Sequence, residues 1–283
     1  MPHEFASEFV EVAGLRTHVL RAGDSGPPLV LLHGTAIDSA RLTYGASLPQ
    51  LGKHFRVYAP DWPGYGQSQP GPSAHGFRFL EDFLHAFLDA MGLPRAHLAG
   101  FSMGGAAALG LALDHPQRVD KLVLIDSYGL GGTVHLPLLP YLALRVRSAD
   151  RYVWSVLRRN KGTLRWFLAT FVLGNACLAT RELVDEVHRQ LMAPGAEGAF
   201  MDWLRGEIRP GRLRTSYRAR LRNLRPLTLI LHGARDLIVP AYRARRAVRL
   251  IPDARLVLVP GCGHWLPREA PGVVERKVME FLG

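Results

Sequence analysis

The stretch Leu98-Ala99-Gly100-Phe101-Ser102-Met103-Gly104-Gly105 carries one serine between an apolar run and an alanine-rich run that continues to Asp114. The pattern Gly-x-Ser-x-Gly is typical of a nucleophile elbow, a strained turn from a strand into a helix that exposes the serine hydroxyl. Gly100 and Gly104 lack the Cβ atoms that would collide where the strand and the helix approach each other. The first N–H groups of the helix would face whatever the serine attacks. Ordinary glycine-rich turns share this pattern, so its meaning depends on the rest of the chain.

Short apolar runs recur on both sides of this turn. Each is too short for a helix and fits a central strand that is buried on both faces. The expected strands are 29–32, 56–59, 122–125, 227–231 and 255–259, after an N-terminal hairpin formed by 8–12 and 15–21. Helices are expected at 77–91, 242–250 and 272–282. Because strands and helices alternate, the pattern predicts an α/β fold with a doubly wound, mostly parallel sheet.

The alternation stops between about residue 129 and residue 223. This segment is richer in Trp and in basic residues, has helix-like patterning and contains no apolar run of the earlier kind. The rhythm of strands and helices then resumes. We therefore expect a core formed by 1–128 and 224–283, with 129–223 inserted as a helical cap over one end of the sheet.

Composition narrows the class of protein. At 283 residues, 48% of them hydrophobic and 21% charged, the chain can form a globular protein with a large core. It has no apolar run of about 18 residues, so no transmembrane segment is expected. Its first residues lack the basic and apolar regions of a signal peptide. The two cysteines, Cys177 and Cys262, do not make a disulfide framework, which favours a cytoplasmic protein. A homo-oligomer is left open.

The net charge of +11 is concentrated in one part of the chain. Residues 141–225 hold 17 Lys and Arg against 7 Asp and Glu, a net charge of +10. Such a segment can face an anionic substrate, a membrane surface or nucleic acid, or it can be a solvated basic face, which we favour. No nucleic-acid-binding motif accompanies it, so no nucleic-acid partner is expected. One further hypothesis is that an arginine of the cap meets an anionic group of the substrate.

Polar residues with catalytic potential follow the apolar runs. In doubly wound sheets, ligands bind beyond the carboxyl ends of the strands. Asp236 follows the run 227–231, and His264 follows the run 255–259. A serine hydroxyl needs a neutral imidazole to accept its proton and a carboxylate to orient that imidazole. Ser102, Asp236 and His264 supply these groups in the order expected of this architecture.

Five motifs, in order along nearly the whole chain except the cap, resemble those of α/β-hydrolase-fold enzymes. They are Leu31-Leu-His33-Gly34, Asp61-Trp-Pro-Gly64-Tyr-Gly66-Gln-Ser68, Gly100-Phe-Ser102-Met-Gly104, Gly233-Ala-Arg-Asp236 and Gly263-His264-Trp265. The resemblance implies that Ser102 is the nucleophile, that His264 is the general base and acid, and that Asp236 orients His264. It also implies an oxyanion hole made by the backbone N–H groups of Met103 and Thr35.

Several residues have rival interpretations. Asp126 also follows a strand and is an alternative to Asp236, because some members of the family place the acid there. Cys262 fits a packed thiol better than a second nucleophile, and His33 fits a structural residue of its loop better than a catalyst. The histidines show no metal-ligand spacing and no nucleotide-binding motif occurs, so neither a metal nor a cofactor is expected.

The substrate is expected to contact loops of the core and aromatic residues of the cap. The candidates are His33, Gly34, Phe101 and Trp265 in the core, and Trp166 and Trp203 in the cap. Further cap aromatics can line the same pocket or form the cap's own small core, namely Tyr141, Trp154, Phe167 and Phe171.

A serine at position 102 argues against the dehalogenases and epoxide hydrolases of this fold, which use an aspartate there. The expected reaction is acyl transfer, and we favour hydrolysis of a small, partly apolar carboxylic ester. The chain also resembles hydrolases that cleave carbon–carbon bonds in ring-fission products. Those usually carry a glycine-rich segment after His-Gly and an asparagine before the serine, where this chain has Thr35-Ala-Ile-Asp and Phe101. Perhydrolase or lactonase activity, and a catalytically silent binding protein, are the remaining alternatives.

Overall fold

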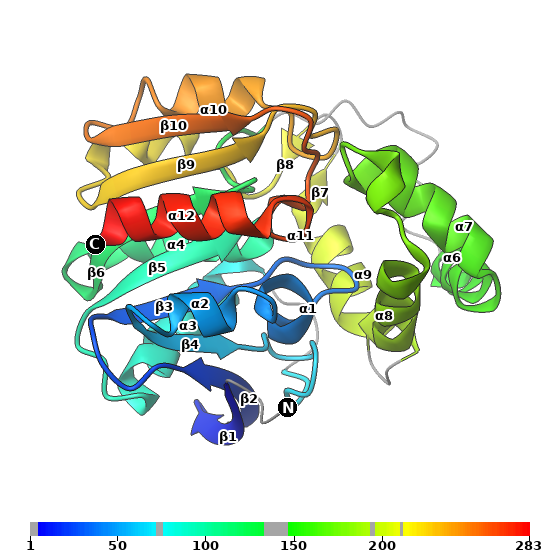
Figure 1. The fold of residues 1–283 in the computed structure, drawn as a ribbon, viewed down its shortest axis with the longest axis horizontal. Coiled ribbons are helices and arrows are strands. Elements are labelled where there is room, and N and C mark those ends of the chain that lie inside the picture. The colour runs from blue at the N-terminus through cyan, green and yellow to red at the C-terminus, as the bar shows by residue number, and fades with distance from the viewer. Residues whose placement is uncertain (1–4, 72–75, 133–146, 193–195, 210–211) are drawn as a thin grey trace.

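The centre of the molecule is a twisted sheet (Figure 1). The structure is a computed structural model, and it describes residues 5–71, 76–132, 147–192, 196–209 and 212–283. Within these ranges the strands of the sheet are β1 (Ala6–Val12), β2 (Leu15–Ala22), β3 (Pro28–Leu32), β4 (Arg56–Pro60), β5 (Ala96–Phe101), β6 (Val119–Ile125), β9 (Leu227–Gly233) and β10 (Ala254–Val259). Their order is β1-β2-β4-β3-β5-β6-β9-β10. Strands β3 to β6, β9 and β10 run parallel, whereas β2 pairs antiparallel with β1 and with β4.

Helices cover both faces of this sheet. On one face the buried core is shared with α3 (Phe77–Ala90), α4 (Met103–Asp114) and α10 (Tyr242–Ala247). On the other face it is shared with α1 (Ala40–Tyr44), α2 (Leu48–Leu51), α11 (Leu266–Glu269) and α12 (Pro271–Leu282). This arrangement confirms the predicted doubly wound, mostly parallel sheet. None of the described helices is long and apolar enough to cross a membrane.

The central strands are continuous apolar runs because both of their faces are covered. Every residue of β5 is buried, so the strand shows none of the alternation of a half-exposed strand. Predicted and observed bounds differ at the polar ends of strands. Strand β6 begins at Val119, earlier than the predicted 122–125, because Asp120 and Lys121 lie half-buried at its amino end and interrupt the apolar pattern.

The described part of the expected cap lies at the end of the sheet where the carboxyl end of β9 is found (Figure 1). It contains α6 (Arg147–Arg159), α7 (Lys161–Phe167), α8 (Arg181–Leu191) and α9 (Ala196–Glu207). Two short antiparallel strands, β7 (Ile208–Arg209) and β8 (Arg212–Leu213), follow α9. They were not expected in a helical segment, because strands this short leave no periodic signal. The division at 129 and 223 stays a prediction, and Tyr141 lies outside the described residues.

A carboxylate binds the cap to the loop that carries His264. Glu269 accepts the N–H of Gly174 from the cap at 2.7 Å and the N–H of Gly263 from the loop at 2.8 Å. The N–H of His264 donates to the carbonyl of Val172 at 2.7 Å. A Cβ atom on Gly174 or on Gly263 would come within 2.4 Å of backbone atoms of the other segment. The two backbones are therefore in direct contact, and the cap holds the loop in place.

We expect Glu269→Gln to weaken this attachment. A glutamine side chain is neutral and has one acceptor oxygen, so both part-buried N–H groups lose a charged partner and one of them loses its acceptor. The expected loss in free energy of unfolding is about 1.5–3 kcal/mol, measured by urea denaturation. The matched control is Glu280→Gln, at an exposed residue that pairs with Lys277 at the surface. This variant should change stability by less than about 0.5 kcal/mol. Equal stability of the two variants would contradict the attachment.

Candidate active site

Ser102 sits in a strained turn between β5 and α4. Its backbone has φ 49° and ψ −113°, a sparsely populated conformation for a residue with a side chain. A Cβ atom on Gly100 would lie 2.4 Å from the carbonyl oxygen of Gly104, and one on Gly104 would lie 2.4 Å from that of Leu32. The N–H of Ser102 donates to the carbonyl of Ile125 at 2.9 Å. The predicted elbow is present, and it turns the hydroxyl out of the strand.

The structure brings the three predicted catalytic side chains together. The hydroxyl oxygen of Ser102 lies 3.0 Å from Nε2 of His264, and Nδ1 of His264 lies 2.8 Å from Oδ2 of Asp236. The other oxygen of Asp236 accepts the N–H groups of Ile238 and Val239, each at 2.8 Å. With the Nδ1 proton of the imidazole directed at the carboxylate, Nε2 is free to accept the proton of the hydroxyl.

The carboxylate of Asp236 makes the imidazole of His264 more basic. Burial disfavours the charged imidazole, but the carboxylate of Asp236 outweighs it and raises the pKa of His264 above 6.5. Burial opposes ionisation of Asp236 as well, yet His264 and His232 hold the pKa of Asp236 well below its usual range. Asp236 is therefore an anion at neutral pH, and it stabilises the imidazolium that proton transfer creates.

Asp126, the rival acid, is turned toward backbone groups instead. Its two oxygens accept the N–H groups of Gly233 at 2.7 Å and Leu266 at 3.1 Å. Burial raises the pKa of Asp126 to about 7, because it outweighs the opposing effect of His232. Asp236, not Asp126, contacts His264. Asp126 instead connects the loops that present Asp236 and His264.

Asp126, His232 and Asp236 form a buried cluster with the composition of a metal site. Every carboxylate oxygen in it already accepts a hydrogen bond from the protein. Nε2 of His232 donates to the carbonyl of Val239 at 2.7 Å, and it lies 3.4 Å from Asp236. The contacts are those of a hydrogen-bond network that supports the carboxylate of Asp236. Sequence reasoning did not assign His232 this place.

The two backbone groups predicted for the oxyanion hole belong to Met103 and Thr35. Met103 is the first residue of α4, so no earlier turn accepts its N–H. Thr35 lines the cavity in front of Ser102, on the loop after β3. Among the described residues, neither N–H group has a hydrogen-bond acceptor. The oxyanion hole itself stays a prediction.

Asp38, which the sequence did not reveal, holds the loop of Thr35. Its carboxylate accepts the N–H of Gly34 at 2.7 Å and the hydroxyl of Thr43 at 2.6 Å. Burial raises the pKa of Asp38. Its only sequence signal is its position four residues after Gly34, in the segment that also distinguishes this chain from the carbon–carbon hydrolases.

A cavity of about 320 Å³ opens in front of Ser102 and His264. Most of its lining is apolar, and residues of the core and of the cap contribute to it. Of the predicted substrate contacts, Phe101, Trp203 and Trp265 line this cavity. The ring of Phe101 lies 5.3 Å from that of His264, so an apolar side chain lies directly beside this imidazole.

Three other predicted contacts are not among the residues that line the cavity. His33 is fully buried, donating from Nδ1 to the carbonyl of Gly34 and accepting the N–H of Trp62 at Nε2. It is a structural residue of its loop, as its rival interpretation proposed. Gly34 contributes space, because a Cβ atom there would lie 2.8 Å from the ring of Phe101. Trp166 is exposed on α7, outside the lining residues.

Arg243 is a lining residue that sequence reasoning missed. Among the described lining residues, Arg243 is the one Lys or Arg side chain. It belongs to α10 in the core. The sequence suggested an arginine of the cap at the substrate, but the arginine found in the described lining lies outside 129–223. Arg243 lies in a run with Arg245 and Arg246, so no spacing in the sequence distinguishes it from its exposed neighbours.

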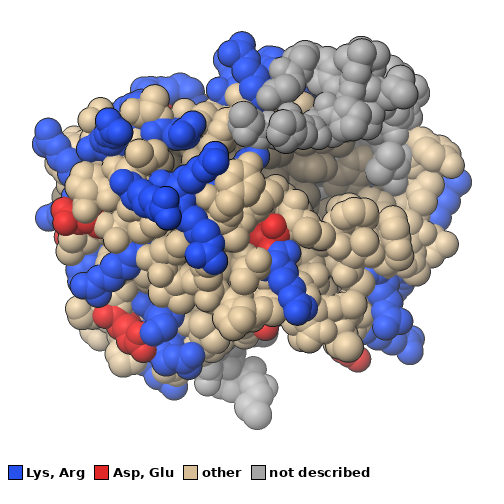
Figure 2. All heavy atoms as spheres, turned by 90° about the horizontal axis from the view of Figure 1, so that it is seen from above, with Lys and Arg blue, Asp and Glu red and all other residues tan. Residues whose placement is uncertain are grey.

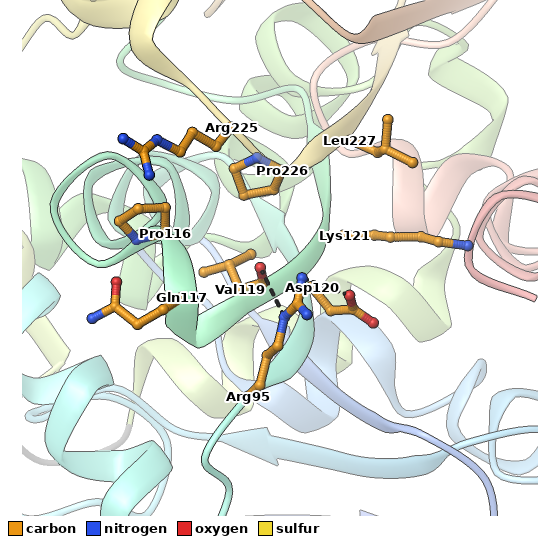
Figure 3. Close-up of a pocket in the computed structure, with 9 residues that line it drawn as sticks. All are labelled: Arg95, Pro116, Gln117, Val119, Asp120, Lys121, Arg225, Pro226 and Leu227. Carbon is orange, nitrogen blue, oxygen red and sulfur yellow. Dashed lines mark hydrogen bonds and ion pairs between the residues drawn. The ribbon is translucent and has the colours of Figure 1, made fainter.

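A second pocket, of about 430 Å³, lies at the opposite end of the sheet, at the amino ends of β6 and β9 (Figure 3). Its Arg95 pairs with Asp120 at 2.9 Å. The ammonium of Lys121 donates to the carbonyls of Phe281 and Leu282, each at 3.0 Å. Both side chains already have partners within the fold. None of the described residues that line this pocket is a nucleophile in contact with a base.

Comparisons with known proteins agree with this fold. A family profile described as the alpha/beta hydrolase fold matches residues 27–271. A 2-hydroxy-6-oxo-6-(2'-aminophenyl)hexa-2,4-dienoic acid hydrolase of Metapseudomonas resinovorans is 29% identical, over 98% of this chain and 91% of that protein. A meta-cleavage product hydrolase of Pseudomonas fluorescens superposes with a TM-score of 0.82 at 27% identity, covering 99% and 98% of the two chains.

Another relative is longer than this chain. It is the dihydrolipoyllysine-residue acetyltransferase component of an acetoin cleaving system from Pseudomonas putida, 31% identical over 92% of this chain. The chain spans 64% of the length of that protein. Because the family profile covers most of the chain and the fold agrees with it, this protein belongs to the alpha/beta hydrolase fold family.

Proposed function

We propose that this protein is a serine hydrolase that cleaves a carboxylic ester through an acyl-enzyme intermediate. The observation that carries the proposal is the chain of contacts from the hydroxyl of Ser102 to His264 to Asp236, at 3.0 and 2.8 Å, opening into an apolar cavity. Its relatives include hydrolases that act on small organic molecules.

The contacts supply each proton transfer of the reaction. His264 takes the proton of Ser102 as the oxygen attacks the ester carbonyl, and the N–H groups of Met103 and Thr35 stabilise the oxyanion. The intermediate collapses when His264 protonates the leaving alcohol, which leaves an acylated Ser102. Water then attacks the acyl group, again giving its proton to His264, and the acid is released with Ser102 restored.

The apolar wall at Phe101 favours an ester with an apolar acyl or aryl group. Phe101 packs against Gly34 and beside the ring of His264, where the carbon–carbon hydrolases usually carry an asparagine. A phenylalanine offers no hydrogen bond to a polar group of the substrate at this place. It offers instead a surface on which burial of an apolar group is favourable.

A second candidate is hydrolysis of a carbon–carbon bond in a ring-fission product that bears a carboxylate. Two observations favour it. One relative is named as the hydrolase of a dienoic acid, and Arg243 places a cation in the lining of the cavity. A guanidinium pairs well with a carboxylate when both are shielded from water.

The cysteines support a reducing compartment, and we propose the cytoplasm. Cys177 is exposed and Cys262 is buried beside the catalytic loop, and both are free thiols. Burial raises the pKa of Cys262 to about 11, so this thiol is protonated and not a second nucleophile at neutral pH.

Ser102→Ala should keep the fold and lose hydrolysis of p-nitrophenyl butyrate. Without its nucleophile such a site typically loses about 10⁶-fold in kcat. A fluorophosphonate probe should label the wild type and not the variant, with equal melting temperatures as the control. Turnover retained by the variant, or an unlabelled wild type, would exclude the proposed nucleophile; the second result would favour a silent binding protein.

Asp236→Asn should lower kcat by about 10³–10⁴-fold, because the imidazole loses its orienting carboxylate. Only neutral His264 accepts a proton, so wild-type kcat/KM should rise with pH to a plateau whose midpoint lies above 6.5. The midpoint should fall in the variant, since the carboxylate that raises the pKa is gone. Asp126→Asn is the matched control and should keep kcat within about tenfold. The reverse ranking would transfer the acid role to Asp126.

A comparison of kcat/KM between two classes of substrate distinguishes the two candidate reactions. We expect kcat/KM to be higher for neutral p-nitrophenyl esters than for a vinylogous 1,5-diketo acid, and Arg243→Gln to leave neutral esters unchanged within about threefold. If the carbon–carbon reaction prevails, the diketo acid is the better substrate, and Arg243→Gln raises its KM about 10- to 100-fold through loss of a charged hydrogen bond. Arg245→Gln, an exposed neighbour, is the control for charge alone.

A further inference from the structure

Large apolar side chains that reach solvent gather around the mouth of the catalytic cavity. Phe167 from the cap and Ile238 from the loop after β9 both line this cavity and are both exposed. Phe171 packs against Phe167 and Trp166, with ring centroids 5.7 and 5.5 Å apart. Trp166 is 59% exposed and Leu237, beside Ile238, is 68% exposed. These five residues are called the mouth patch below.

The mouth patch is held in one arrangement with the catalytic residues. A guanidinium N–H of Arg235, two residues before Leu237, donates to the carbonyl of Gly174 at 3.3 Å. The carbonyl of Val172, next to Phe171, accepts the N–H of His264 at 2.7 Å. The apolar side chains therefore face solvent in the same conformation in which the catalytic contacts are formed.

The two chain segments that carry the mouth patch hold almost no acidic side chains. Residues 160–181 contain no acidic side chain, and residues 231–252 contain only Asp236, which is buried against His264. The exposed arginines of these segments include Arg165, Arg235, Arg245 and Arg246. Figure 2 looks onto the side of the molecule that carries α10 and β10. Lys and Arg atoms dominate Asp and Glu atoms there, and the surface is hollowed toward the right of the view.

We propose that this face docks onto an anionic lipid bilayer. An apolar centre with arginines beside it matches a membrane surface, where acyl chains lie beneath a layer of anionic phosphates. The mouth patch would enter the boundary between headgroups and acyl chains, and the arginines would contact the phosphates. The cavity mouth would then open at the lipid surface. Docking goes beyond the proposed function and does not depend on which bond the site cleaves.

A bilayer fits these features better than a second copy of the chain or a nucleic acid. A two-fold dimer through this face would bring the arginines of one copy toward those of the other, and like charges repel. A nucleic acid would pair with the arginines but leave the mouth patch in water, where exposed apolar surface is unfavourable.

The test is co-sedimentation of the purified full chain with vesicles. One set contains phosphatidylcholine alone and the other phosphatidylcholine with 30% phosphatidylglycerol. We expect binding to the anionic vesicles only, weakening as salt is raised. The double variant Arg245→Glu/Arg246→Glu should bind at least about 25-fold more weakly, since each arginine near an anionic surface contributes roughly fivefold. Trp166→Ser/Leu237→Ser should weaken binding about tenfold or more at high salt, where the apolar contribution remains.

Matched control variants carry the same changes at the opposite end of the sheet. Arg222→Glu/Arg225→Glu reverses two exposed arginines near the amino end of β9, and Leu227→Ser removes an exposed apolar side chain there. These variants should bind like the wild type. Melting temperatures within about 3 °C of the wild type show that each variant is folded.

Three results would overturn the proposal. The first is absence of binding to anionic vesicles at low salt. The second is equal weakening by the control variants, which would assign binding to net charge. The third is a dimer in analytical ultracentrifugation that only the mouth-patch variants abolish, which would assign the face to a second copy. Because the readout is binding, a failed esterase assay leaves this result unaffected.

Discussion

The catalytic arrangement depends on backbone segments that touch where glycines leave out a side chain. At the elbow, a Cβ atom on Gly104 would collide with the carbonyl of Leu32, so helix α4 packs directly on strand β3. Near His264, a Cβ atom on Gly233 would lie 1.9 Å from the carbonyl of Gly263. Gly174 then packs on this same loop from the cap. Because the close contacts are between backbones, they fix the loops more tightly than flexible side chains would.

Buried charge is the second constraint, and hydrogen bonds balance it. Asp236 and Asp126 are both buried next to His232 and His264, and each carboxylate oxygen accepts at least one hydrogen bond from the protein. The partners differ. Asp236 faces an imidazole and stays ionised, whereas Asp126 faces backbone amides and has a pKa of about 7. Two carboxylates a short distance apart thus acquire different roles from their surroundings.

The motifs were sufficient to predict the sheet, the elbow and the meeting of Ser102 with His264 and Asp236. Each is coded locally, by an apolar run too short for a helix or by a glycine at a fixed distance from a polar residue. Only some of the predicted substrate contacts lie at the cavity. Trp203 and Trp265 line the cavity, but Trp166 points to solvent and His33 is sealed inside its loop. The sequence pattern around a tryptophan in a helix does not show whether its side chain faces the cavity or water.

The sequence alone determined the alternation of sheet strands with the longer core helices and the identity of the polar groups at the strand ends, because these follow from short-range periodicity and turn chemistry. Only the tertiary structure shows which of Asp236 and Asp126 contacts His264. Both follow a strand, but just one points its carboxylate at Nδ1 of His264. It also decided the places of Arg243, which lines the cavity together with residues of the cap, and of Glu269, which accepts the N–H of Gly174. Contacts between segments that are distant in the chain leave no recognisable spacing in the sequence, because packing geometry and not a local pattern brings the segments together.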